Sequence, residues 1–305
     1  MASQADLDRF YVTLVESARS AGGVCAITSD MACVGHNVAQ STKDCDLLCA
    51  TESAELFLKQ LAQTEFESAS CSYRGHLTPP LDARWMRGGW TAHFEWKSAA
   101  GVAHLDIFGV APRASSPWAD DVHGLLAGMH TVAEMKRTDR AKDWPFATAL
   151  GVKLLEGGDL RGWWHLFDAD ALRRMIARVP CPAEVIAKRP VLELLVNHDS
   201  RLDVAVFAES MFWQQLDRLR LRIHEAFMRK YRSAVTKAAG VDDPDLEVQH
   251  RVRRQFALEF LPQNPLRDYG IERLIAEARE ETLRFVAPGS LDWLPDASRH
   301  FVGLA

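Results

Sequence analysis

The sequence predicts an α/β fold in which a small mixed sheet with packed helices is followed by a mostly helical region. Short apolar runs with strand character are concentrated before about residue 110. Two of these runs, 90–96 and 102–110, flank a turn of small and polar residues, which is a hairpin pattern. After Pro117, nearly every segment has apolar residues at helical spacing and ends at a proline.

Local periodicity also predicts the order of the elements. Leu7 to Ala18 carry apolar residues at three- and four-residue intervals, which indicates an amphipathic helix that the following pair of glycines ends. The expected elements before residue 110 are helices at 7–18, 31–34 and 53–66, and strands at 24–27, 44–50, 90–96 and 102–110. We place a domain boundary near 112–120, which gives an α/β domain at 1–115 and a helical domain at 116–305.

The longest predicted helix runs from about Arg201 to Ala239 and ends before a glycine. Its apolar positions recur at intervals of three, four and seven: Leu202, Val206, Trp213, Leu216, Ile223, Phe227 and Tyr231. A second stripe consists of Arg218, Arg222, Arg229 and Arg232. This stripe is either a solvated face or a surface for a nucleic-acid backbone, and the helix could also pair two chains.

Composition excludes several classes of protein. With 48% hydrophobic and 25% charged residues, the 305-residue chain can bury a sizeable core, and a net charge of −5 argues against coating nucleic acid by bulk charge. No stretch approaches the roughly 20 apolar residues needed to cross a bilayer, and the first residues lack a signal-peptide pattern. Six cysteines without a C-x-x-C pair then predict reduced thiols in a cytoplasmic protein.

Two carboxylates in the second predicted strand form the sharpest local feature. Asp44 and Asp46 project from the same face of a strand, about 6–7 Å apart, because side chains alternate along it. Carboxylates that close resist joint ionisation unless a cation neutralises them, and Mg²⁺ accepts such ligands together with phosphate oxygens. The alternative is a pair of solvated aspartates at the end of a strand.

A third carboxylate, Asp106, lies inside an otherwise apolar strand. A buried charge is costly unless it is paired or binds a metal. Either Asp106 joins the two earlier carboxylates, or it forms an ion pair with one of three nearby arginines, Arg74, Arg84 or Arg87. Glu95, on the preceding strand, competes for the role of third carboxylate.

These residues together resemble the motif of the polymerase-β-like nucleotidyltransferase superfamily. That motif has a short strand, a turn with serine that opens a helix, an Asp-x-Asp strand and a later acidic residue, and Ser29, Asp44, Asp46 and Asp106 match it in order. A second segment, 136–143, is similar to the Lys-x3-Arg-x-Lys-Asp segment of the minimal and abortive-infection-type members.

On a helix, Lys136 and Arg140 would share one face and could grip one anion, with Asp143 orienting them. The alternative for this segment is a solvated, charged helix end.

The resemblance implies an activity and a set of site residues. It implies transfer of a nucleoside monophosphate from an NTP to a hydroxyl of RNA, a protein or a small molecule, dependent on Mg²⁺ or Mn²⁺, in a toxin–antitoxin or phage-defence setting. It assigns Asp44, Asp46 and Asp106 as metal ligands and catalytic residues. It assigns the nucleotide phosphates to Ser29, Lys136, Arg140 and Lys142.

The chain departs from the family motif at one position. The family turn has glycine beside the serine, because the backbone approaches the triphosphate closely, whereas this chain has Asp30. A carboxylate there would repel incoming phosphates unless it turns away to cap the following helix. The rival hypothesis is therefore a catalytically silent binding or interaction module with a nucleotidyltransferase fold.

Overall fold

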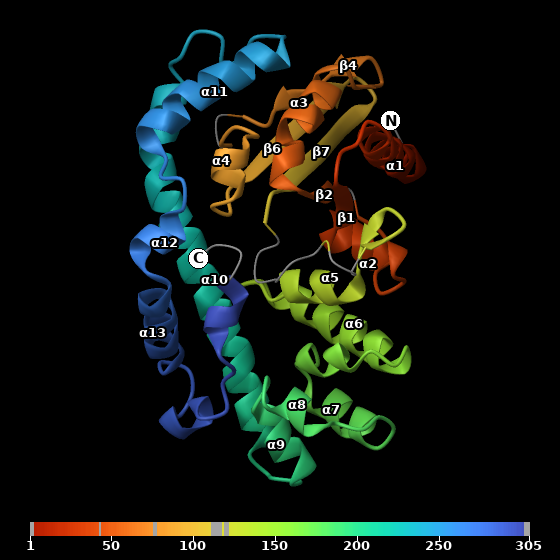
Figure 1. Cartoon of the computed structure of the whole chain (residues 1–305), viewed down its shortest axis with the longest axis vertical. Coiled ribbons are helices and arrows are strands. Elements are labelled where there is room, and N and C mark those ends of the chain that lie inside the picture. Colours follow the sequence, from red (N-terminus) through yellow and green to blue (C-terminus); the bar gives the residue numbers. More distant parts are fainter. Residues whose placement is uncertain (1–2, 43, 76–77, 111–117, 119–121, 302–305) are drawn as a thin grey trace.

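The computed structural model describes residues 3–42, 44–75, 78–110, 118 and 122–301 (Figure 1). A mixed sheet with helices packed against it lies toward one end of the molecule, and a largely helical region occupies the rest. The predicted α/β fold class is confirmed. Among the residues described, no helix is both long enough and apolar enough to span a membrane.

The main sheet has the strand order β5-β6-β7-β2-β1-β9-β8. Its strands are β1 (Cys25–Thr28), β2 (Asp44–Cys49), β5 (Ser72–Tyr73), β6 (Thr91–Ser98), β7 (Gly101–Phe108), β8 (Val122–His123) and β9 (Leu126–Ala127). The β2–β7 and β1–β9 pairs are parallel, and the other pairs are antiparallel. The predicted hairpin of β6 and β7 turns between Ser98 and Gly101.

Two short strands extend the sheet past the boundary that the sequence predicts. β9 pairs with β1 through Ile27 and Leu126, and β8 pairs with β9. Most residues of the expected boundary at 112–120 lie outside those that the structure describes. The segment 122–127, which we expected to be helical, therefore belongs to the sheet, and two-residue strands are too short to leave a periodic pattern.

One face of the sheet is covered by α1 (Gln4–Ser20) and α3 (Ala54–Ala62). The helix α1 begins at a capping box, in which the Ser3 hydroxyl accepts from the backbone N–H of Asp6 and the Asp6 carboxylate accepts from that of Ser3. The helix expected at 53–66 ends at Ala62, because the next residues form β3 (Glu65–Phe66), which pairs with β4 (Ala69–Ser70).

The opposite face is only partly covered. Helices α2 (Ser29–Gly35), α5 (Met129–Met135) and α6 (Trp144–Glu156) pack on the half of this face that carries Leu48 and Phe108. The half that carries Asp44, Asp46 and Asp106 is polar instead. The covering helices therefore leave a polar surface beside the start of α2 and the end of α5.

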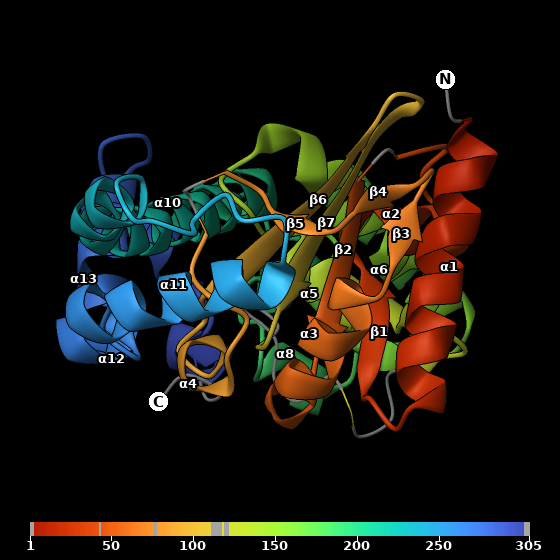
Figure 2. The ribbon, with the colours of Figure 1, turned by 90° about the horizontal axis from the view of Figure 1, so that it is seen from above.

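The long helix α10 (Leu202–Val235) spans much of the molecule (Figure 1). The remaining helices are α4 (Ala83–Met86), α7 (Ala169–Ile176), α8 (Ala183–Ile186), α9 (Val191–Val196), α11 (Leu246–Phe260), α12 (Pro265–Tyr269) and α13 (Ile271–Thr282). Single 3₁₀ turns are η1 (Thr51–Ser53), η2 (Ala141–Asp143), η3 (Leu160–Trp164), η4 (Pro288–Leu291) and η5 (Ala297–Phe301). Viewed from above, α10 to α13 group on one side of the sheet and α1 lies on the other (Figure 2).

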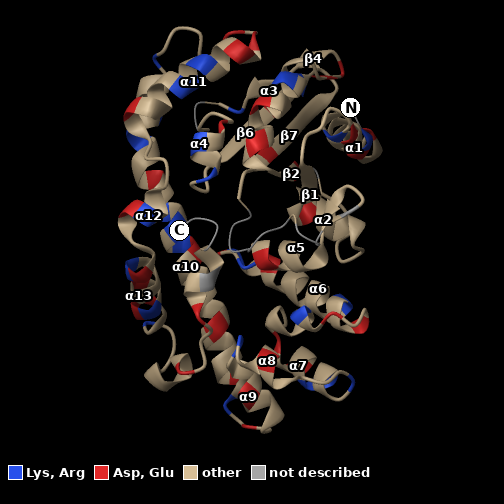
Figure 3. Ribbon diagram, viewed as in Figure 1, with Lys and Arg blue, Asp and Glu red and all other residues tan. Residues whose placement is uncertain are grey.

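The predicted apolar seam of α10 is buried except at Phe227, which is 38% exposed. The arginines at 218, 222 and 229 are exposed, whereas Arg232 pairs with Glu225 at 2.6 Å. Basic and acidic residues are interspersed along the ribbon of the helical region (Figure 3). The helix α11 returns the chain to the sheet, where Gln249 Oε1 accepts from the backbone N–H of Tyr73 at 3.0 Å.

The hydroxyl of Tyr11 attaches α1 to β7. It donates to the carbonyl oxygen of His104 and accepts from the backbone N–H of the same residue, each at 2.9 Å. We expect Tyr11→Phe to lower the free energy of unfolding by about 1–3 kcal/mol, because both backbone groups lose a buried partner. Urea denaturation measures the change. Tyr269→Phe is the matched control, since its hydroxyl bonds the side chain of Glu277 and no backbone group, and an equal loss in both variants would contradict the prediction.

Candidate functional site

The pairing of β2 with β7 brings two carboxylates together. Asp46 lies directly opposite Asp106 in this parallel pair, and Asp44 lies opposite His104. Alternation along β2 puts Cys45 and its apolar neighbours on the other face. Asp44, Asp46 and Asp106 therefore share the polar half of the open face, with the last two on adjacent strands.

The Asp106 carboxylate has two partners, Arg74 and His93. Its Oδ1 lies 2.9 Å from a guanidinium nitrogen of Arg74 and 2.7 Å from Nδ1 of His93. Burial raises the pKa of Asp106, but the hydrogen bonds and charges of His93 and Arg74 outweigh this and hold the pKa below its ordinary value. Of the three arginines that the sequence offered for an ion pair, Arg74 forms it, and Arg84 and Arg87 are exposed.

Asp46 has the opposite electrostatic balance. Burial, together with the neighbouring charge of Asp106, raises the pKa of Asp46 to about 7. A hydrogen bond from Ser29 and the charge of Lys136 act in the other direction without cancelling these effects. Near neutral pH, Asp46 is therefore poised between its protonated and ionised forms and would gain from a cation beside it.

Asp44 lies apart from this pair. Its side chain is 66% exposed and approaches Nδ1 of His104 at 3.2 Å. Within the described part of the chain, no group of three His, Cys, Asp or Glu side chains is arranged to hold a metal ion. Glu95, the competing third carboxylate, is 5% exposed and pairs with Lys97 at 2.6 Å. It also lies 3.9 Å from Nε2 of His104, the histidine whose Nδ1 contacts Asp44.

Ser29 occupies the tight turn between β1 and α2. Its φ of +53° lies in the left-handed region, which costs a residue with a side chain about 1 kcal/mol or more. This strain explains why glycine is favoured in such turns. The turn directs the Ser29 side chain toward Asp46, and Nζ of Lys136 lies 3.5 Å from its hydroxyl oxygen.

Lys136 is the cation closest to this turn, and it is already paired. Its side chain is 1% exposed, and its ammonium contacts the carboxylate of Asp30 and lies 3.4 Å from Asp143. Burial lowers the pKa of Lys136, but Asp143 and Asp30 outweigh it and hold the pKa above its ordinary value. Asp30 thus does not cap α2 but neutralises the lysine expected to face phosphates.

The segment 136–143 is not the helix that we expected. The helix α5 ends at Met135, and Thr138 then closes a turn by donating to Oδ2 of Asp143 at 2.6 Å and accepting from the backbone N–H of Arg140. This local side-chain bonding replaces helical hydrogen bonds. Asp143 nevertheless contacts both Lys136 and Arg140, because the turn, like the expected helix, brings the three side chains together.

The other two basic residues expected at the phosphates are more open. The side chain of Arg140 is 51% exposed, while its Nε donates to Asp143 at 2.8 Å. Lys142 is exposed. Burial raises the pKa of Asp30, but the charge of Lys136 and the smaller effect of Lys142 outweigh burial and hold this pKa below its ordinary value. The structure therefore groups Ser29, Lys136, Arg140 and Lys142 around Asp30.

Sequence reasoning missed His93 as a partner of Asp106. The signal was present in the hairpin, because a turn that pairs Ser98 with Gly101 also fixes His93 opposite Asp106. Trp85, which lies between Arg84 and Arg87 in sequence, is 1% exposed and packs in the core, so its ring is not available to stack on a base.

Comparisons with protein-family models, curated proteins and solved structures find no match to this chain. The geometry of Asp46, Asp106 and Lys136 therefore carries the functional inference.

The raised pKa of Asp46 makes stability depend on pH. Because the folded-state pKa of about 7 exceeds the ordinary value near 3.9, the favourable effect of protonation is complete at low pH and is lost as pH rises through 7. We expect Asp46→Asn to gain about 1–3 kcal/mol of unfolding free energy at pH 8 relative to its effect at pH 5. Denaturant unfolding at both pH values measures this gain. The exposed Asp268→Asn is the control, and an equal response of both variants would contradict the prediction.

Proposed function

We propose that this chain is a nucleotidyltransferase of the polymerase-β-like superfamily that moves a nucleoside monophosphate from an NTP to a hydroxyl. The observation that carries the proposal is the apposition of Asp46 and Asp106 on adjacent parallel strands, next to the Ser29 turn and Lys136. This arrangement supplies carboxylates for a divalent cation and a cationic, hydroxyl-bearing edge for phosphates.

The carboxylate pair fits a divalent cation. Burial and the neighbouring charge of Asp106 raise the pKa of Asp46, and a cation between the two carboxylates would relieve their repulsion. Oxygen ligands of this kind suit Mg²⁺ and Mn²⁺. A bound Mg²⁺ would supply charge to activate the acceptor hydroxyl and to offset the phosphate charge. To bind the cation, Asp106 would give up part of its contact with Arg74. Asp44 would give up its contact with His104 and become the third ligand.

The basic residues would receive the triphosphate. Arg140 and Lys142 are exposed and can contact phosphate oxygens directly, and the Ser29 hydroxyl can donate to one. Lys136 adds positive potential from its buried position, although Asp30 and Asp143 already balance its charge. The expected affinity for NTP therefore depends on whether the ion pair between Asp30 and Lys136 breaks when phosphate binds.

The acceptor hydroxyl belongs to RNA, a protein or a small molecule in this proposal. The exposed Arg218, Arg222 and Arg229 on α10 support RNA as the first acceptor to test. A toxin–antitoxin or phage-defence setting follows from the resemblance to abortive-infection-type members. Buried free thiols at five of the six cysteines support the cytoplasm as its compartment.

We also propose that α10 associates with another copy of the chain. Large apolar side chains on this helix are exposed: Val204 by 53%, Phe207 by 52%, Leu221 by 44% and Phe227 by 38%. Covering such side chains would remove apolar surface from water.

A catalytically silent module is the second candidate function, and one observation favours it. The Asp30 carboxylate contacts the Lys136 ammonium, which is where a phosphate oxygen would bind. Asp143 also lies against Lys136, so two carboxylates already share this ammonium. Such a site would bind nucleotide weakly and could leave the fold to serve a binding role.

Replacing each carboxylate tests the catalytic proposal. We expect Asp44→Asn, Asp46→Asn and Asp106→Asn each to lower nucleotidyl transfer at least about 100-fold, because the cation would lose a ligand charge. Pyrophosphate release with each of the four NTPs and Mg²⁺ or Mn²⁺, with RNA added, measures the rate. Asp268→Asn is the matched control, and full activity in Asp46→Asn would refute the proposal.

Asp30 separates the two candidate functions. We expect Asp30→Asn to tighten NTP binding about tenfold, since the change removes a negative charge and releases Lys136 for a phosphate. Titration calorimetry with ATP or GTP and Mg²⁺ measures the affinity, and Asp30→Glu, which keeps the charge, is the control. Turnover by Asp30→Asn but not by the parent chain would identify a silenced enzyme, and no NTP binding by either would count against the nucleotidyltransferase.

A further inference from the structure

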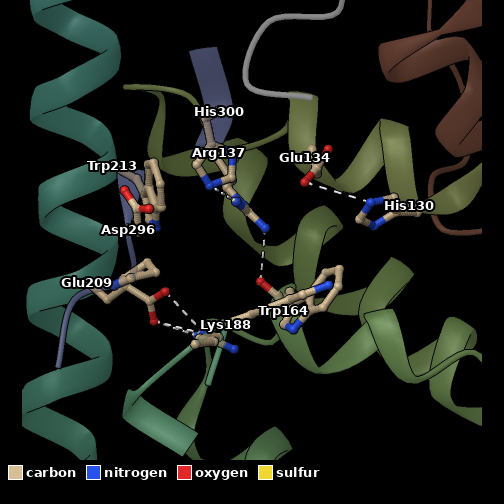
Figure 4. A pocket seen from close by; sticks show the side chains of 11 residues that line it. His130, Glu134, Arg137, Trp164, Lys188, Glu209, Trp213, Asp296 and His300 are labelled. Carbon is tan, nitrogen blue, oxygen red and sulfur yellow. Dashed lines mark hydrogen bonds and ion pairs between the residues drawn. The ribbon is translucent and has the colours of Figure 1, made fainter. Parts of the chain in front are cut away.

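A cavity lies in the helical region, and neither Asp46 nor Asp106 lines it. It has a volume of about 360 Å³ and is lined by side chains from α5 and the residues after it, η3, the segment between α8 and α9, α10, and the segment before and within η5 (Figure 4). Arg137 and Lys136 are sequence neighbours, yet Arg137 lines this cavity whereas Lys136 contacts Asp30 and Asp143. No residue used in the proposed function lines it.

The charges that line the cavity cancel. Three basic side chains face three acidic ones: Arg137, Lys188 and Arg189, with Glu134, Glu209 and Asp296. Arg189 and Glu209 form a buried ion pair at 2.8 Å, in which each side chain is 2% exposed. Burial and the charges of Arg161 and Arg137 lower the pKa of His130 to about 3, so this ring is neutral. A cavity without net charge favours an uncharged ligand, because it offers a bound ion no compensating charge.

The walls nevertheless hold N–H donors that have no acceptor among the described residues. Nε1 of Trp213, Nε1 of Trp164 and Nε of Arg137 are all buried without a hydrogen-bond partner. Trp213 is 1% exposed, and both indoles line the cavity. An unmet buried donor costs about 1–3 kcal/mol, and a ligand with acceptor atoms on its edge would recover that cost.

The donors are also held in place before a ligand arrives. The guanidinium of Arg137 donates to the carbonyl oxygen of Trp164 at 3.1 Å and to Nδ1 of His165 and Nε2 of His300 at 3.2 Å each. The same guanidinium stacks over the ring of Trp213, at 5.3 Å from its centroid. A cavity whose polar groups are already ordered loses little conformational entropy on binding.

We propose that this cavity binds a flat, uncharged heteroaromatic ring that carries carbonyl or ring-nitrogen acceptors, which is the chemistry of a nucleobase. The two indoles line the cavity with cations over their rings, Arg137 over Trp213 and Lys188 over Trp164, and the unpartnered N–H groups supply the donors for the ligand's acceptors. The volume lies within the range of small-molecule sites. A carboxylate or phosphate ion is disfavoured because the lining has no net charge.

Binding of simple probes to the full chain tests the proposal. We expect at least one of adenosine, inosine, cytidine and uridine to bind with a Kd below about 1 mM without a divalent cation, and more tightly than benzoate, measured by titration calorimetry. Trp164→Phe keeps an aromatic ring but removes an indole N–H, so it should weaken binding about five- to tenfold. Trp213→Phe should act similarly.

Trp293→Phe is the matched control. That indole also has a guanidinium over its ring, that of Arg201 at 5.4 Å, but it lies outside the cavity. The proposal is overturned if no nucleoside binds, if benzoate binds more tightly than every nucleoside, or if Trp164→Phe and Trp293→Phe change affinity equally. Because Trp164 is only partly buried, its variant keeps the test available should Trp213→Phe fail to fold.

The source of the ring is distinguished by a further arm of the experiment. A free nucleoside that binds as well as ATP, and equally in Asp46→Asn, marks a site separate from the proposed catalytic one. ATP that binds more tightly only with Mg²⁺ and intact Asp46 marks the ring of the nucleotide substrate itself. If the parent chain binds a nucleoside but shows no nucleotidyl transfer, the proposed function is refuted and the proposal for this cavity stands.

Discussion

The parallel register of β2 and β7 is the constraint on which the candidate site depends. It sets Asp46 against Asp106 across two hydrogen-bonded strands, on a half of the sheet that the helices leave polar. Arg74 and His93 stabilise the ionised form of Asp106. Burial and the charge of Asp106 disfavour the ionised form of Asp46. This asymmetry supports the proposed cation site, because adding positive charge would stabilise Asp46 most.

The same site contains the feature that opposes its proposed activity. Lys136 has a buried ammonium with two carboxylate neighbours, Asp30 and Asp143, and the first of these stands where the family turn has glycine. Burial requires such a cation to be paired, so the contact stabilises the fold while it competes with phosphate. In the proposed function, nucleotide binding and structural stability therefore depend on the same lysine. Arg140 and Lys142, which remain exposed, are the residues that can shift this competition.

Local patterns predicted much of the fold and half of the site. Alternation placed Asp44 and Asp46 on one face, and a charge in an apolar strand singled out Asp106. The pairing of Asp46 with Asp106 joins strands some sixty residues apart and leaves no local signal. The turn at 136–143 was mistaken for a helix, because a charge spacing of four does not reveal that Thr138 bonds Asp143. The helical cavity combines residues from distant segments, so spacing could not predict it.

The most direct test of the account is the titration of the Asp46 carboxyl carbon by ¹³C NMR, assigned by comparison with Asp46→Asn. Without a divalent cation, we expect a pKa of about 7, set by burial and by Asp106. Millimolar Mg²⁺ should lower this pKa by at least one unit, since the cation favours the ionised form. A pKa near 4 that Mg²⁺ does not change would contradict both the coupled carboxylate pair and the cation site proposed on it.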